Sequence, residues 1–208
     1  MELSTWLAFF AASWAISISP GAGAVAAMSA GLNHGFRRGY FTTYGLVLGI
    51  WTQVVVVGVG LGALVAASST AFLVIKWLGV AYLVWLGIAQ WRAPPTPLVA
   101  QAEGGGALAS RRVMILRAWM INAVNPKGTV FLLAVVPQFM NLSQPLLPQY
   151  LLIAATLGFT DLVVMAGYTA LAAKVLGSLK SPAHLRAMNR VFGSLFVVAG
   201  SLLALFKR

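Results

Sequence analysis

The sequence lacks cysteine and is poor in charged residues. Of 208 residues only three are Asp or Glu, and charged residues of both signs make up 8% of the chain. The absence of cysteine excludes a disulfide framework and any thiolate metal site. A soluble globular domain carries about 25% charged residues, so this composition excludes that class and favours a membrane protein.

What the chain does contain is apolar residues, which make up 60% of it. A membrane-spanning helix needs about 20 residues, so 208 residues hold six spans and leave no room for a separate soluble domain. We therefore predict an all-α polytopic membrane protein with six transmembrane helices. The six apolar runs lie at residues 5–32, 40–67, 72–91, 113–140, 149–174 and 190–206.

Basic residues determine the predicted orientation. Ten of the fourteen Lys and Arg residues fall on one side of the predicted spans: Arg37, Arg38, Arg92, Arg111, Arg112, Arg117, Lys174, Lys180, Arg186 and Arg190. By the positive-inside rule this side is cytoplasmic, which predicts a bacterial inner-membrane protein with both termini in the periplasm. We expect these bases to contact anionic lipid at the cytoplasmic face, and we do not expect nucleic acid as a partner.

The two halves of the chain resemble each other. A linker at 93–112, rich in proline and glycine, separates residues 1–92 from residues 113–208. Three features recur in the same order: Ser19–Gly21 with Asn125–Lys127, Gly49–Gln53 with Gly158–Asp161, and Lys76–Tyr82 with Arg190–Phe196. Because each half has an odd number of spans, the second enters from the opposite side. The sequence thus predicts two inverted three-helix repeats, in which substrate sites lie at the repeat interface near the midplane.

Asp161 is the only acid inside a predicted span, close to the centre of 149–174. A carboxylate at that depth costs about 2.5–3.5 kcal/mol on insertion scales, so it should face a cavity or a partner. One interpretation is a static buried pair with Lys127. The other, which we favour, is a direct role in binding substrate and in proton coupling.

Pro126 is predicted to break the fourth span near its middle. Proline suits the first position of a new half-helix, and Asn125 is a preferred capping residue before it. The free amides of such an end attract anions, and Lys127 adds a positive charge, so a substrate carboxylate fits here. The alternative is a simple kink with Lys127 reaching toward the surface.

Pro20 is predicted to break the first span in the same way. Gly21 and Gly23 relax the backbone there, which leaves carbonyls that can bind a solute ammonium. Ser19 precedes the break. These four residues complete the predicted substrate site, and Gln53 and Thr160 in the second matched pair of stretches are secondary candidates.

No set of residues points to catalysis or to a cofactor. His34 and His184 fall in different predicted loops with no acids clustered near them, which argues against a metal site. No serine has a histidine and a carboxylate placed to form a triad. We therefore expect neither an enzyme nor a bound cofactor.

The sequence resembles the LysE/RhtB family of amino-acid exporters along nearly its whole length. The stretches that carry the resemblance are Ser19–Gly21, Leu32–Gly39, Lys76–Gly87, Asn125–Lys127, Pro137–Phe139 and Asn189–Phe196. The form of residues 19–23 and the stretch from Asp161 to Tyr168 are most similar to the homoserine/threonine branch, which makes Tyr168 a further secondary candidate. Many family members have a second proline where this chain has Ala22.

The resemblance implies efflux of small neutral amino acids or their derivatives, such as homoserine, threonine or homoserine lactone. It also implies proton antiport and a homodimer. Three alternatives remain: export of basic amino acids or of another small metabolite, a non-transporting membrane subunit, and a membrane enzyme. A single intramembrane acid argues against a dibasic substrate, because two cationic groups would share one carboxylate.

Overall fold

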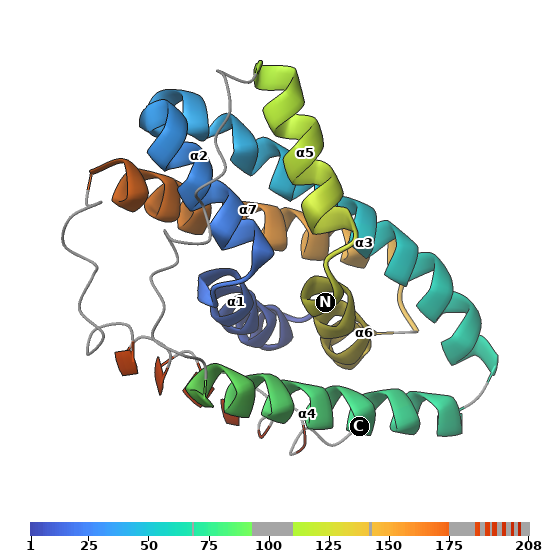
Figure 1. Ribbon diagram of the computed structural model, residues 1–208. Helices are drawn as coiled ribbons and strands as arrows, with labels where there is room; N and C mark the ends of the chain where they lie inside the picture. The colour runs from blue at the N-terminus through green and yellow to red at the C-terminus, as the bar shows by residue number, and fades with distance from the viewer. Residues whose placement is uncertain are drawn as a thin grey trace.

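The computed structural model describes residues 1–67, 69–92, 110–141 and 143–174, and isolated positions between 186 and 204. Within these residues all regular structure is helical, which confirms the predicted all-α class (Figure 1). The helices are α1 (Leu3–Ile18), α2 (Ala22–Gly39), α3 (Phe41–Ala67), α4 (Ser69–Arg92), α5 (Arg111–Ala123), α6 (Pro126–Phe139) and α7 (Leu146–Lys174).

The helices are long and apolar in the manner of a membrane protein. The segment Phe41–Gly60 of α3 and the whole of α7 are each long and apolar enough to cross a bilayer. The pair α1 and α2 and the pair α5 and α6 qualify if each bent pair counts as one span. The third predicted span falls within α4, whereas most of the sixth, at 190–206, and most of the linker lie outside the described residues. The inverted repeat stays a prediction.

Large apolar side chains on the outer surface fit a lipid environment. Val55, Val59 and Leu151 are 61–74% exposed, and they lie on the two helices that are long enough to span. A soluble monomer rarely exposes contiguous apolar surface of this kind, whereas lipid tails solvate it.

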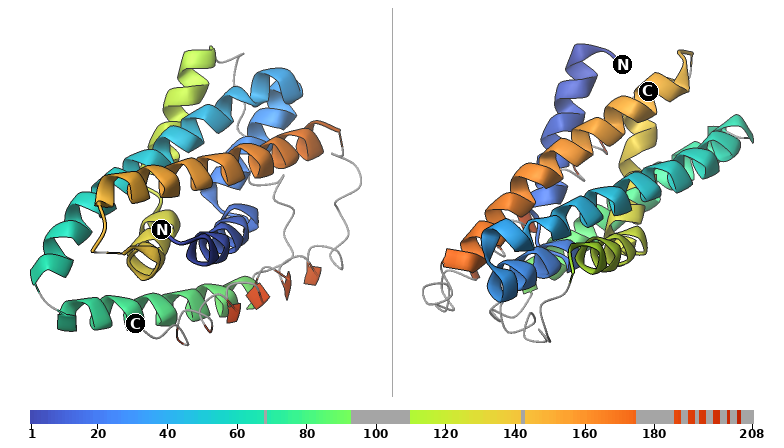
Figure 2. Two further views of the ribbon diagram at one scale, coloured as in Figure 1. Left: turned by 180° about the vertical axis from the view of Figure 1, so that it is seen from behind. Right: turned by 90° about the horizontal axis from the view of Figure 1, so that it is seen from above.

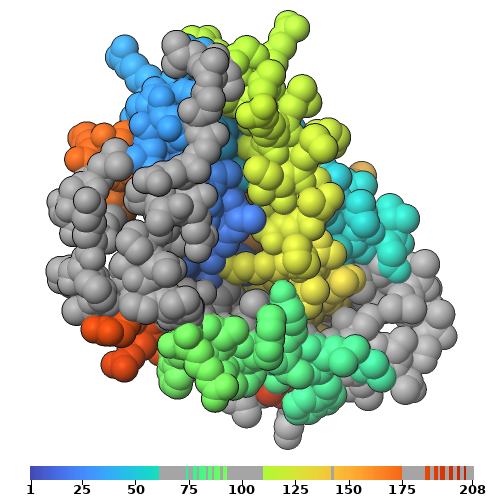
Figure 3. Space-filling model, viewed as in Figure 1, coloured from blue at the N-terminus to red at the C-terminus, as the bar shows by residue number. Residues whose placement is uncertain are grey.

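Both bent pairs, α1 with α2 and α5 with α6, pack against the pair of long helices α3 and α7. α5 packs along α3, α2 packs along α7, and α3 and α7 contact each other. α1 and α6 lie between the α3–α7 pair and α4 (Figures 1 and 2). α4 packs on α6 and crosses its lower end in the space-filling view (Figure 3).

Two apolar clusters fill the interior. One joins α1, α3, α6 and α7 and includes the fully buried Phe9, Phe131 and Ile153. The other joins α2, α3, α5 and α7 and includes Ala27 and Ala118. Among the residues that line the central cavity, Ile50 and Leu157 belong to the first cluster and Ala24, Leu46 and Met165 to the second, so the cavity lies between the two clusters.

Glycines let α5 approach α3 closely beside this cavity. A Cβ atom on Gly45 would overlap the carbonyl oxygen of Ile115, and one on Gly49 would lie 2.6 Å from Cβ of Asn122. Small residues at membrane helix interfaces permit such an approach and bring polar side chains within hydrogen-bonding reach of the next helix. As a result Nδ2 of Asn122 donates to the carbonyl oxygen of Leu46 at 2.7 Å.

Candidate functional site

Two interruptions of the helices form the frame of the site. α1 ends at Ile18 and α2 begins at Ala22, with a bend of 56° between them. α5 ends at Ala123 and α6 begins at Pro126, with a bend of 54°. A proline lies in or directly after each interruption, where its missing N–H and fixed φ disfavour a continuous helix.

Asn125 caps the new helix α6. Its Oδ1 accepts a hydrogen bond from the backbone N–H of Lys127 at 3.1 Å, and Pro126 occupies the first helical position. The N–H of Thr129 donates to the carbonyl oxygen of Asn125 at 3.2 Å. The bond from Thr129 is the first regular bond of α6, so the cap engages one amide that we expected to be open to an anion, that of Lys127.

The carbonyls freed between α1 and α2 are bonded by side chains from the second half of the chain. Nζ of Lys127 lies 2.8 Å from the carbonyl oxygen of Ser19, 2.8 Å from its Oγ and 3.3 Å from the carbonyl oxygen of Pro20. The hydroxyl of Tyr168 donates to the carbonyl oxygen of Ile18.

The carbonyls freed between α5 and α6 are bonded by a side chain from the first half. Nε2 of Gln53 donates to the carbonyl oxygens of Asn122 at 2.6 Å and of Asn125 at 2.9 Å. Gln53 is buried on α3. Each interruption is thus held by polar side chains of the opposite half, which satisfies backbone groups that a bilayer interior cannot.

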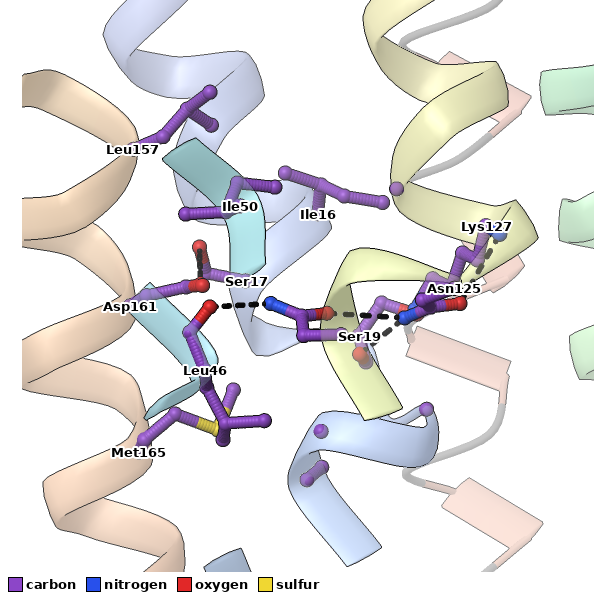
Figure 4. Close-up of a pocket in the computed structure, with 15 residues that line it drawn as sticks. Ile16, Ser17, Ser19, Leu46, Ile50, Asn125, Lys127, Leu157, Asp161 and Met165 are labelled. Carbon is purple, nitrogen blue, oxygen red and sulfur yellow. Dashed lines mark hydrogen bonds between the residues drawn. The ribbon is translucent and has the colours of Figure 1, made fainter. Parts of the chain in front are cut away.

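A cavity of about 50 Å³ opens between the two interruptions (Figure 4). This volume holds a few water molecules, so an amino acid would enter only after some widening. The lining residues come from α1, α2, α3, α5, α6 and α7 and from the two interruptions: Ile16, Ser17, Ser19, Gly21, Gly23, Ala24, Leu46, Ile50, Asn122, Asn125, Lys127, Gly128, Leu157, Asp161 and Met165.

Asp161 and Lys127 lie on opposite sides of this cavity (Figure 4). Oδ1 of Asp161 accepts a hydrogen bond from Oγ of Ser17 at 2.6 Å, and the same Oγ lies 3.0 Å from Oγ1 of Thr160. Lys127 is held by the oxygens of Ser19 and Pro20. The cavity therefore presents an acid on one wall and a base on the other, and its lining between them includes both apolar side chains and the polar Ser17, Ser19, Asn122 and Asn125.

The structure brings most of the predicted site residues together. Six of them line the cavity: Ser19, Gly21, Gly23, Asn125, Lys127 and Asp161. Pro20 contributes its carbonyl oxygen to Lys127, and Pro126 begins α6. The secondary candidates Gln53, Thr160 and Tyr168 do not line it, but each forms a hydrogen bond to a residue of α1 or of an interruption.

Two polar lining residues were missing from the predicted site. Ser17 lies two residues before Ser19 and bonds Asp161. Asn122 lies one turn before the cap, and its Oδ1 accepts from Nδ2 of Asn125 at 3.3 Å. A polar residue within one turn of a predicted break is the signal that would have found both. His184 is outside the described residues, among which no group of three His, Cys, Asp or Glu could hold a metal ion.

Replacing Gln53 by leucine is expected to destabilise the site. The carbonyl oxygens of Asn122 and Asn125 would each lose the bond from Gln53 but keep a backbone donor, from Asn125 and Thr129 respectively. The cost is therefore that of two hydrogen bonds, at about 0.5–1.5 kcal/mol each. The thermal midpoint in detergent should therefore fall by several degrees. Thr52→Ser on the same helix is the matched control, because it keeps the hydroxyl that donates to Leu48 and accepts from Trp119. Equal midpoints for the two variants would contradict the role assigned to Gln53.

Comparison with known proteins gives consistent matches. The model of the LysE type translocator family matches residues 14–206. The chain is 42% identical over 207 residues, or 98% of each chain, to a homoserine/homoserine lactone efflux protein of Salmonella typhimurium. It is 42% identical over 209 residues to a membrane protein of Vibrio cholerae, with all of both chains covered. A leucine efflux protein of Enterobacter is 28% identical over 192 residues, 91% of this chain and 90% of the relative. No solved structure matches.

Proposed function

Because the chain belongs to the LysE family of translocators, and is therefore a membrane transporter and not an enzyme, we propose that it exports small neutral amino acids and their derivatives from the cytoplasm. Homoserine, threonine and homoserine lactone are the proposed substrates, and protons moving inward are the proposed driving ions. The observation that carries the proposal is the cavity with Asp161 and Lys127 on opposite walls.

The charges of the cavity match those of an amino acid. With one acid and one base the cavity has no net formal charge, which suits a zwitterion, whereas a dibasic substrate would bring a net positive charge into it. The substrate carboxylate is expected to pair with Lys127 through a charge-assisted hydrogen bond. Leu46, Ile50 and Met165 supply the apolar wall for a short side chain. The 42% identity to a homoserine/homoserine lactone efflux protein supports the choice of substrates.

The two bent pairs are proposed to be single broken spans. In this arrangement α1 with α2 and α5 with α6 occupy corresponding places in two inverted repeats, and the substrate lies between their interruptions. The end of α2, with Arg37 and Arg38, and the start of α5, with Arg111, would then lie at the cytoplasmic face. These two ends are neighbours, since the guanidinium of Arg111 lies 4.6 Å from the ring of Phe41, just after α2. Anionic lipid at this face and a second copy of the chain are the proposed partners.

This orientation predicts that both termini face the periplasm of a bacterial inner membrane. A phosphatase reporter that works only in the periplasm should be active when fused after Arg208. The same reporter fused within the segment 93–109 should be inactive, because that segment is predicted to be cytoplasmic. The reverse pattern of activities would show that the orientation is wrong.

Transport in inverted membrane vesicles tests the proposed function directly. In such vesicles the cytoplasmic face points outward, so an exporter should accumulate labelled homoserine inside when the lumen is acidic. Collapse of the pH gradient should remove the accumulation, and unlabelled threonine and homoserine lactone should compete. Equal accumulation of homoserine with and without the pH gradient would exclude proton antiport. If only leucine or only lysine competed with labelled homoserine, the proposed substrates would be wrong.

A further inference from the structure

The amine of Lys127 sits in a cradle of three neutral oxygens. They are the carbonyl oxygen of Ser19 at 2.8 Å, its Oγ at 2.8 Å and the carbonyl oxygen of Pro20 at 3.3 Å. An ammonium group has three N–H donors and no acceptor, and here it meets three acceptors. We call these three oxygens the cradle.

The cradle depends on the interruption between α1 and α2. In a continuous helix the carbonyls of residues 19 and 20 would be bonded to amides one turn later, so they would not be open to a side chain. The Lys127 side chain also lies against Gly21, since a Cβ atom there would be 3.4 Å from Cδ and 3.5 Å from Nζ. The backbone at residues 19–21 and the side chain of Lys127 are thus in close contact, although they are more than 100 residues apart in the sequence.

An ammonium taken out of water is costly unless its donors are satisfied. The cradle satisfies them. When a substrate carboxylate draws Lys127 toward itself, the cradle loses its cation. A second ammonium of the same charge then finds the same three acceptors.

We infer that the cradle is an ammonium-binding subsite, which Lys127 fills before substrate binds and yields to the ammonium of the substrate. This inference rests on the proposed function as an amino-acid exporter. The substrate ammonium replaces Nζ at the three oxygens, and the displaced Nζ donates to the carboxylate or ester carbonyl on the neighbouring carbon. One ammonium replaces another, so the net charge bound by the cradle does not change.

This exchange selects for a particular chemical group. A ligand with an ammonium but no adjacent carbonyl oxygen expels Lys127 without giving it a partner, so it should bind poorly. A carboxylic acid without an ammonium leaves the cradle empty and should also bind poorly. Homoserine and its lactone differ in their carbonyl group, but both carry an ammonium beside a carbonyl.

Chemical rescue tests the subsite without any transport measurement. Lys127→Ala removes Cγ, Cδ, Cε and Nζ, which are the atoms that n-propylammonium supplies. We expect n-propylammonium chloride at millimolar concentrations to raise the thermal midpoint of the purified variant by about 4 °C or more. It should not raise that of the wild-type protein, in which Lys127 fills the cradle. Tetramethylammonium and 1-propanol, which lack the donors or the charge, should have no effect on the variant.

Three further variants make the test decisive. Lys174→Ala is the matched control, because Lys174 is an exposed residue at the end of α7 and is expected to show no rescue. Adding Ser19→Ala to Lys127→Ala removes one oxygen and should abolish most of the rescue. If Lys127→Ala does not fold, Lys127→Met keeps a side chain that reaches the position of Cε, so only Nζ is missing and ammonium becomes the probe.

The inference is overturned if the amine leaves both Lys127 variants unchanged, or stabilises the wild type and Lys174→Ala equally. Homoserine accumulation in vesicles would in that case still support the proposed function. Rescue without any gradient-driven accumulation would support the subsite and contradict the export of homoserine.

Discussion

Asp161→Asn is expected to abolish gradient-driven export while substrate exchange continues. Asparagine has nearly the same shape as aspartate and can still accept the hydrogen bond from Ser17, so the cavity should remain intact. It cannot gain or lose a proton, however, and Asp161 is the only acid within the predicted spans. A transporter that couples through this group would then carry substrate only down its own gradient.

Two assays in proteoliposomes separate these outcomes. Accumulation of labelled homoserine under a pH gradient should fall to background in Asp161→Asn, whereas exchange of internal for external homoserine should persist. Asp161→Glu is the matched control, since it keeps a titratable carboxyl group at this position and should retain part of the accumulation. If Asp161→Asn accumulated homoserine to the wild-type level with an unchanged pH dependence, Asp161 would not couple transport to protons and its role would be structural.

Lys127→Ala is expected to weaken homoserine binding by about 10- to 100-fold. The substrate carboxylate would lose a charge-assisted hydrogen bond worth about 1.5–3 kcal/mol, and each 1.4 kcal/mol changes the affinity tenfold. Homoserine lactone presents a neutral carbonyl in place of the carboxylate, so in this variant it loses only a weaker, neutral hydrogen bond. For either ligand, the ammonium no longer has to displace Lys127 from the cradle. The affinity for the lactone should therefore fall by less than about tenfold.

Equilibrium binding of both ligands to the purified variant measures this difference. The ratio of the two dissociation constants is the informative quantity, because a general distortion of the cavity would weaken both ligands alike. Thr129→Val in the same turn is a useful control, since the Thr129 hydroxyl donates to the carbonyl oxygen of Asn125 and does not line the cavity. An equal loss for both ligands would contradict the assignment of Lys127 to the carboxylate.

The positions of the helices could largely be predicted from the sequence. The predicted runs at 40–67 and 149–174 correspond to α3 (Phe41–Ala67) and α7 (Leu146–Lys174). Long apolar runs form helices in a bilayer, because a helix satisfies the backbone hydrogen bonds within the run itself. Asp161 and Lys127 were identifiable for a related reason. A charged side chain inside such a run raises the free energy of membrane insertion, so it usually marks a binding site or a charge pair.

The tertiary structure alone decided which groups these residues meet. The sequence left open a direct pair between Asp161 and Lys127, but Ser17 bonds the acid and the two charged groups face each other across the cavity. It also assigned the free carbonyls near Pro20 to a solute, whereas in the structure the amine of Lys127 occupies them. Local rules fix where a helix ends, because caps and prolines act within one turn. Contacts between residues more than 100 positions apart depend instead on how closely the helices pack, which no local pattern encodes.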